Sequence, residues 1–223
     1  MPSWGNALVV GAALAVGVVA LRGKPAASVA PVARVAPVAR VDHELAVPVH
    51  AGAGALVIDG ELEEPIWHGA VARTGAFLDA SGAPARPYSD ARLVSVGDDL
   101  VVALYAADED IRTAGSSRDL FRVTIGATTF EVSATGELVG APRGTRVGHD
   151  LDGTLDDASD DDEEWVIELA IPWASLDLPS GRERAHVAFE AERCDVTRDG
   201  ARSCSSTRAT LVGLAAQLDR AGP

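Results

Sequence analysis

The stretch DLFRVTIGATTFEVSA, residues 119–134, decides the fold class of this chain of 223 residues. Apolar and polar side chains alternate on either side of Gly126 and Ala127, a pattern typical of two half-buried strands joined by a two-residue turn. If those two residues form the loop, Val123 pairs with Phe130 on the face toward the core. The stretch therefore predicts an antiparallel hairpin with one buried face.

The other face of this hairpin is polar and carries a pair of opposite charges. The same register sets Arg122 opposite Glu131. Side chains two residues apart share a face of a strand, so the outward set comprises Leu120, Arg122, Thr124, Thr129, Glu131 and Ser133. The charged pair is either an exposed ion pair of small energetic value or part of a polar binding face. We take Arg122, Glu131, Thr124 and Thr129 as candidate ligand-binding residues.

Short strands recur along the chain from about residue 49, separated by Gly, Pro, Asp and Ser, as in all-β domains. We expect helical turns at residues 61–67 and 173–176, and strands near residues 54–58, 70–77, 90–96, 100–107, 119–125, 128–133, 165–171, 185–194 and 202–212. This pattern predicts an all-β fold, an antiparallel two-sheet sandwich, in preference to a barrel.

Composition argues against several functional classes. Asp and Glu number 33 against 19 Lys and Arg, which gives a net charge of -14 and disfavours nucleic acid as a partner. The chain has two Cys and one Met, and its single Lys is Lys24. A multi-thiolate zinc site and lysine-dependent covalent chemistry are therefore not expected in the folded part.

Residues 1–24 are expected to direct the chain to a membrane. Ala7 to Leu21 is an uninterrupted run of small or apolar residues, followed by Arg22 and Lys24. Such a segment is either a membrane helix that remains as an anchor or a cleaved signal peptide.

Residues 25–48 are predicted to be a linker rich in Pro, Ala and Val. The hexad VAPVAR occurs there twice, and proline at this spacing favours an extended chain. The β-sandwich domain is accordingly expected to comprise residues 49–223.

Four stretches occur in an order that matches a known family. IDGELEEPIW at Ile58 to Trp67 matches an IDG-x-L-x-E-x-x-W opening, and WVIELAIPWASLDLPSG at Trp165 to Gly181 matches W-x-v-E-x-a-I-P-w-x-x-L; between them lie DARLVSVGDDLVVALYAADEDI and the hairpin. The chain resembles the family-9 carbohydrate-binding modules, which are related to DOMON domains. The resemblance implies a jelly-roll-like β-sandwich, packed positions for Trp67, Trp165 and Trp173, and non-catalytic binding of an oligo- or polysaccharide.

The resemblance also implies where a sugar would be held. The family clamps it between aromatic side chains of two loops, which correspond here to residues 113–119 and 198–207 and contain no Trp, Tyr or Phe. Arg122 stands where the family has an acidic residue. Sugar rings dock their apolar faces on aromatic rings, so we expect weak binding or a different ligand, with Tyr88 and Tyr105 as the remaining aromatic candidates.

Cys194 and Cys204 flank a predicted turn centred on Asp199, which would place them opposite each other on paired strands. They are either bonded or two free thiols, and we predict a disulfide. A disulfide indicates an oxidising compartment, and hence an extracytoplasmic chain, membrane-anchored or secreted.

Asp150 to Glu164, DLDGTLDDASDDDEE, is rich in carboxylates. It is either a solvated acidic loop or a loose calcium site. The weak metal candidates are Asp150, Asp152 and Asp156.

The sequence contains no motif typical of a catalytic nucleophile, a zinc protease or a phosphate-binding loop, and its five His are scattered. We therefore expect no enzyme. The two functions that remain are glycan binding and, as the alternative, an envelope domain whose partner is a protein.

Overall fold

The structure is a computed structural model that describes residues 43–50, 56–115, 118–178 and 186–214. The apolar segment Ala7 to Leu21, expected to form a membrane or signal helix, lies outside the described residues. Within the described part, no helix is long and apolar enough to cross a membrane.

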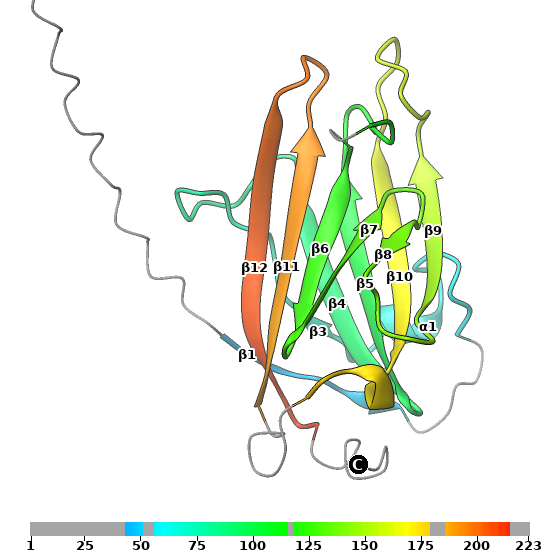
Figure 1. The fold of residues 1–223 in the computed structure, drawn as a ribbon, viewed down its shortest axis with the longest axis vertical. Helices are drawn as coiled ribbons and strands as arrows, with labels where there is room; N and C mark the ends of the chain where they lie inside the picture. The colour runs from blue at the N-terminus through cyan, green and yellow to red at the C-terminus, as the bar shows by residue number, and fades with distance from the viewer. Residues whose placement is uncertain (1–42, 51–55, 116–117, 179–185, 215–223) are drawn as a thin grey trace, which may run out of the picture. The chain divides into compact units, whose positions relative to one another are not determined.

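Two β-sheets lie face to face (Figure 1) and enclose the main apolar core. Sheet A has the order β1 (His43–Ala46), β12 (Arg202–Val212), β11 (His186–Val196), β6 (Leu120–Ile125), β7 (Thr128–Ser133) and β8 (Leu138–Val139). Sheet B has the order β2 (Val49–His50), β4 (Ser89–Val96), β5 (Asp99–Ala107), β10 (Glu164–Pro172) and β9 (Arg146–Asp152), with β3 (Ala72–Arg73) also beside β4. The two helical turns are α1 (Pro65–His68) and η1 (Trp173–Ser175).

The predicted two-sheet sandwich is confirmed, but both sheets are mixed and not antiparallel throughout. Strand β1 runs parallel to β12, and β2 runs parallel to β4. The chain passes from the edge of sheet A to sheet B within residues 43–50, so one short segment adds a parallel edge strand to each sheet. Residues 43–46, which we assigned to the linker, therefore belong to the sandwich.

Seven of the expected strands are present as β4, β5, β6, β7, β10, β11 and β12. The strand expected at 70–77 is reduced to Ala72–Arg73, and residues 56–58 form no strand. The sequence analysis missed β8 and β9. Strand β9, RVGHDLD, has a single buried residue, Gly148, so no apolar alternation marks it; its pairing with β10 makes it a strand.

The predicted hairpin register is confirmed, with Arg122 opposite Glu131 and Val123 opposite Phe130. Two of the six residues expected to emerge on the outer face, Leu120 and Ser133, are nevertheless buried. Leu120 is paired with the disulfide-bonded Cys194. The Ser133 hydroxyl accepts the backbone N–H of Glu137 in the turn after β7, which satisfies its polar group.

Three tryptophans are fully enclosed, as the family resemblance implied, and each indole N–H has a partner. The Nε1 of Trp165 donates to Asp108 and that of Trp173 donates to Ser95. Trp67 lies on the outer face of sheet B in a second apolar cluster, over Val94, Val96, Val101, Ala103 and Ala170. Its Nε1 donates to Glu168 at 2.6 Å. A buried donor without an acceptor would destabilise the fold.

Glu168 ties the opening segment of the domain to sheet B. Its Oε2 accepts the backbone N–H groups of Asp59 at 3.1 Å and Gly60 at 2.9 Å, while Oε1 accepts the Trp67 indole. The approach is close: a Cβ on Gly60 would lie 2.2 Å from the carbonyl carbon of His149, and one on Gly148 would lie 2.4 Å from the Asp59 nitrogen. Glycine is therefore required on both segments where the IDG segment crosses β9: Gly60 on the IDG segment and Gly148 on the strand.

We predict that Glu168→Ala lowers the free energy of unfolding by about 3 kcal/mol or more, because two buried N–H donors and one partly buried N–H donor lose their acceptor. Glu168→Gln retains one acceptor oxygen and should cost roughly half as much. Urea unfolding of both variants measures the effect. Glu163→Ala, an exposed change just before the same strand, is the control; equal effects of Glu163→Ala and Glu168→Ala would contradict the role of Glu168.

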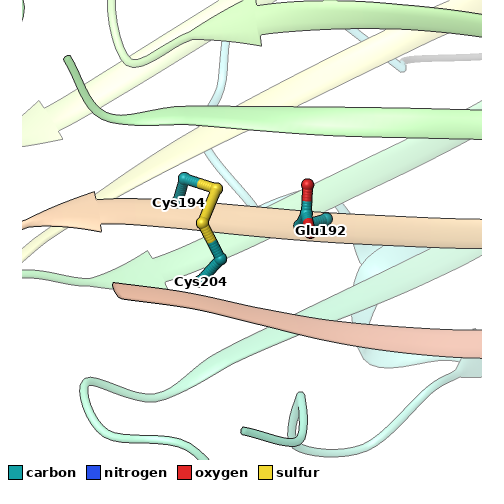
Figure 2. Close-up of side chains that lie close together, drawn as sticks. All are labelled: Glu192, Cys194 and Cys204. Carbon is teal, nitrogen blue, oxygen red and sulfur yellow. A yellow bond between two sulfur atoms is a disulfide. The ribbon is translucent and has the colours of Figure 1, made fainter. Parts of the chain in front are cut away.

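The predicted disulfide between Cys194 and Cys204 is confirmed. The two residues are directly opposite in the β11–β12 register, with Cα atoms 4.1 Å apart. Figure 2 shows the bond crossing between the two strands, with Glu192 nearby on β11. The bond therefore closes the hairpin next to its turn.

We predict that reduction of this disulfide lowers the free energy of unfolding by about 2 to 3 kcal/mol, since the loop that it closes is short. Urea unfolding with and without a reductant measures the change. The double variant Cys194→Ala, Cys204→Ala should unfold like the reduced protein and should not respond to the reductant. Two titratable thiols in the denatured, unreduced protein would overturn the prediction.

Candidate functional site

The structure brings four predicted site residues together on the outer face of sheet A. Arg122 donates to Glu131 at 2.8 Å, and the hydroxyls of Thr124 and Thr129 are hydrogen-bonded at 2.9 Å. Glu192 of β11, which the sequence analysis did not select, accepts a second bond from Arg122 at 2.8 Å. Every hydrogen-bonding side chain in this group therefore already has a protein partner.

Tyr105, the fifth candidate, lies on a different sheet. It belongs to β5, where its pairing opposite Asp90 and Val166 places it on the outer face of sheet B. Burial and a hydrogen bond to Glu164 raise the pKa of its hydroxyl. Tyr105 and Arg122 thus cannot form one site on one sheet.

The structure does not assemble the candidate calcium ligands Asp150, Asp152 and Asp156. The first two lie on β9, and Asp156 is bound to Thr113, whose hydroxyl and backbone N–H both donate to it. Within the described residues these three carboxylates form no cluster of metal-ligand spacing. Strand β9, which the sequence analysis missed, contains Asp150 and Asp152 and ends before Asp156, which is hydrogen-bonded to Thr113 instead.

Three other carboxylates do converge, at the end of the sandwich where the β5–β6, β9–β10 and β11–β12 connections meet (Figure 1). Asp108, Asp119 and Asp195 are buried, with oxygen atoms within 4.8 Å of one another. Arg193, which is 1% exposed, donates to Asp108 at 2.9 Å and to Asp195 at 2.8 Å. The guanidinium thus supplies the positive charge that a buried acidic group requires.

Asp119 lies beside this ion pair and accepts the backbone N–H groups of Arg112 and Val196. Burial, and then the charge of Asp108, raise the pKa of Asp119 to about 7, although the two N–H bonds oppose the shift. The carboxyl therefore titrates near neutral pH.

A cleft of about 650 Å³ opens at the same end of the sandwich. Its lining comprises the segment Pro84, Ala85, Arg86, Pro87 and Tyr88, together with residues 107–110 and Asp162, Glu163, Asp195, Thr197 and Arg198. Tyr88 is 42% exposed. The cleft combines apolar side chains, those of Pro84, Ala85 and Pro87, with hydrogen-bonding groups, the usual composition of a small-ligand site.

Arg198 holds the loops around the cleft together. Its Nη2 donates to the carbonyl oxygens of Glu109 at 2.8 Å and Asp160 at 2.6 Å, and to the Asp161 carboxylate at 2.8 Å. The sequence analysis missed Arg193 and Arg198. No local motif marks them, because most of their partners, such as Asp108 for Arg193 and Glu109 and Asp161 for Arg198, are distant in the sequence.

Solved structures with the same fold are known, whereas no protein-family model and no curated protein matches the sequence. A family-9 carbohydrate-binding module from Caldicellulosiruptor kristjanssonii in complex with cellotriose has a TM-score of 0.53 and 15% identity, over 76% of this chain and 94% of that one. A family-9 module from the same organism in complex with glucose gives 0.51 and 14%, over 74% and 84%. A candidate carbohydrate-binding protein from Bacteroides uniformis gives 0.54 and 12%, over 77% and 99%.

The expected resemblance to family-9 carbohydrate-binding modules is therefore confirmed at the level of the fold. At identities of 12 to 15%, the comparison describes the sandwich and does not assign a ligand.

We predict that the free energy of unfolding falls as the pH rises through neutrality. The folded pKa of Asp119, about 7, lies above its ordinary value of 3.8, so its contribution to stability is fully present below about pH 3.8 and is lost as the pH rises through about 7. Burial raises the pKa of Glu168 to about 7 as well and acts in the same direction.

Urea unfolding over this pH range measures the effect, with Asp119→Asn as the test variant. Its unfolding free energy should depend less steeply on pH than that of the wild type. Glu163→Gln, at an exposed position, should retain the wild-type slope. A wild-type slope in Asp119→Asn would contradict the assignment.

Proposed function

We propose that this domain binds a saccharide without catalysing a reaction, and that the sugar occupies the cleft at the loop end. The observation that carries the proposal is Tyr88, an exposed aromatic side chain that lines a cleft together with prolines, carboxylates and Arg198. A sugar ring offers an apolar face and a rim of hydroxyl groups, so it matches both kinds of side chain in such a cleft.

Two further observations support the proposal. The fold neighbours include modules in complex with cellotriose and glucose. The disulfide between Cys194 and Cys204 suits an extracytoplasmic location, where polysaccharides are accessible. We also propose that the apolar N-terminal segment directs the domain to a membrane, as an anchor or as a signal peptide.

The outer face of sheet A is the less suitable site. Arg122 bridges Glu131 and Glu192, so a sugar hydroxyl would have to replace existing charge-assisted hydrogen bonds. In the loop-end cleft, by contrast, the exposed ring of Tyr88 offers an apolar surface for a sugar face.

We predict that glucose and cellotriose bind the full-length protein with dissociation constants in roughly the millimolar range, because a single tyrosine replaces a two-sided clamp. Tyr88→Ala should weaken binding about threefold to tenfold, the worth of one aromatic stacking contact. Chemical-shift titration by NMR measures affinities of this order and identifies the residues that move.

Matched variants separate the two possible locations. Tyr88→Phe retains the ring and should bind like the wild type, and Arg122→Ala should have no effect. If Arg122→Ala loses binding while Tyr88→Ala binds like the wild type, the binding site lies on the outer face of sheet A and not in the cleft. No binding of any saccharide would favour a protein-interaction domain in place of a glycan-binding one.

A further inference from the structure

The outer face of sheet B presents a second aromatic side chain beside Tyr88. Alternation along β4 places Asp90 and Arg92 on the same side as Tyr88, and the register sets Tyr105 of β5 directly opposite Asp90. The ring centroids of Tyr88 and Tyr105 are 6.0 Å apart, a spacing comparable to the length of one sugar unit. The two rings therefore form a continuous aromatic surface.

Each of the two rings has a carboxylate nearby. The Tyr88 hydroxyl donates to Asp90 at 3.0 Å. Tyr105 and Glu164, on the neighbouring strands β5 and β10, line the same groove, and burial followed by the interaction with Glu164 raises the pKa of the Tyr105 hydroxyl. An aromatic side chain that such a bond holds in place, as it holds Tyr88, loses little conformational freedom when a ligand binds.

Each of the two tyrosines lines a different hollow. Tyr88 lines the loop-end cleft, and Tyr105 lines a groove of about 430 Å³ on the outer face of sheet B. One wall of this groove is the opening segment Gly60 to Glu63, with His68, and its floor includes Val166 and Glu164. The wall stands there because Glu168 binds the Gly60 backbone to the sheet.

We propose that cleft, tyrosine pair and groove form one track that binds a linear, uncharged oligosaccharide of several units. The inference rests on the proposed saccharide binding in the cleft and extends it to a chain. A linear saccharide fits because its rings offer apolar faces at the tyrosines and hydroxyl groups to Arg92, Glu164 and the groove wall.

The negative charge of the track restricts which saccharides it can bind. Glu61, Glu63, Asp150 and Glu164 border the groove, against Arg92 and His68. The charges of Asp59 and Glu63 raise the pKa of Glu61, as expected in a negative field. A saccharide with uronate or sulfate groups would be repelled.

The angle between the rings restricts the state of the ligand. The ring planes of Tyr88 and Tyr105 are inclined by 58°, so successive sugar rings that pack on them must be rotated relative to each other. A flat crystalline surface cannot contact both tyrosines at once. The track therefore suits a single soluble chain.

The experiment compares glucose, cellobiose, cellotriose and cellotetraose by NMR titration of the full-length protein. Affinity should rise about threefold to tenfold along the series, since each added stacking contact is of modest strength. Tyr105→Ala should bind glucose like the wild type but lose the gain with chain length, and Tyr105→Phe should retain it. Oligogalacturonate should bind more weakly than cellotetraose, and crystalline cellulose should not retain the protein.

An affinity that is independent of chain length, or a wild-type gain in Tyr105→Ala, would overturn the track while leaving glucose binding in the cleft intact. Stronger binding of oligogalacturonate than of cellotetraose would contradict the proposal that the ligand is uncharged. If the domain binds no saccharide in the cleft, the result is different: the NMR signals of the cleft residues do not shift with glucose or with any longer chain.

Discussion

The buried carboxylate of Glu168 is the constraint on which the outer layer of sheet B depends. It accepts three N–H groups from a segment that lies more than one hundred residues earlier in the chain. Because a buried carboxylate is costly without donors, and the donors are costly without an acceptor, the segment and the strand stabilise each other. The result is the apolar cover of Trp67 over sheet B and, beside it, the wall of the outer groove.

A second buried polar group links the two sheets at the loop end of the sandwich. Asp108 accepts both the Trp165 indole and the Arg193 guanidinium, so it joins a tryptophan of sheet B to an arginine of sheet A. The Nη atoms of Arg193 are hydrogen-bonded to Asp108, Asp195, Ser89 and the Ala107 carbonyl, so removal of one partner would leave a buried charge uncompensated. The loops that border the cleft begin and end within a few residues of this network, which explains why a cleft is maintained there.

The contrast with Arg122 separates a structural ion pair from a candidate site. Arg122 is about half exposed and neutralised by two glutamates, an arrangement worth little energetically. The exposed aromatic surface lies instead at Tyr88 and Tyr105. The sandwich resembles family-9 modules in its fold, and under the proposed function Tyr88 and Tyr105 are its saccharide-binding surface.

The sequence alone determined the local features. Alternation fixed the hairpin register of Val123 with Phe130, the spacing about Asp199 indicated the disulfide, and the IDG and W-x-v-E stretches indicated the sandwich. Tertiary structure decided everything that depends on contacts between distant segments: the parallel edge strands β1 and β2, the pairing that makes the polar β9 a strand, the burial of Leu120 and the convergence of Asp108, Asp119 and Asp195 around Arg193. The same applies to the site, since nothing local indicates that Tyr88 and Tyr105 are neighbours. Periodicity assigns a side chain to a face of its own strand, but only sheet order and strand register determine which side chains of other strands lie beside it.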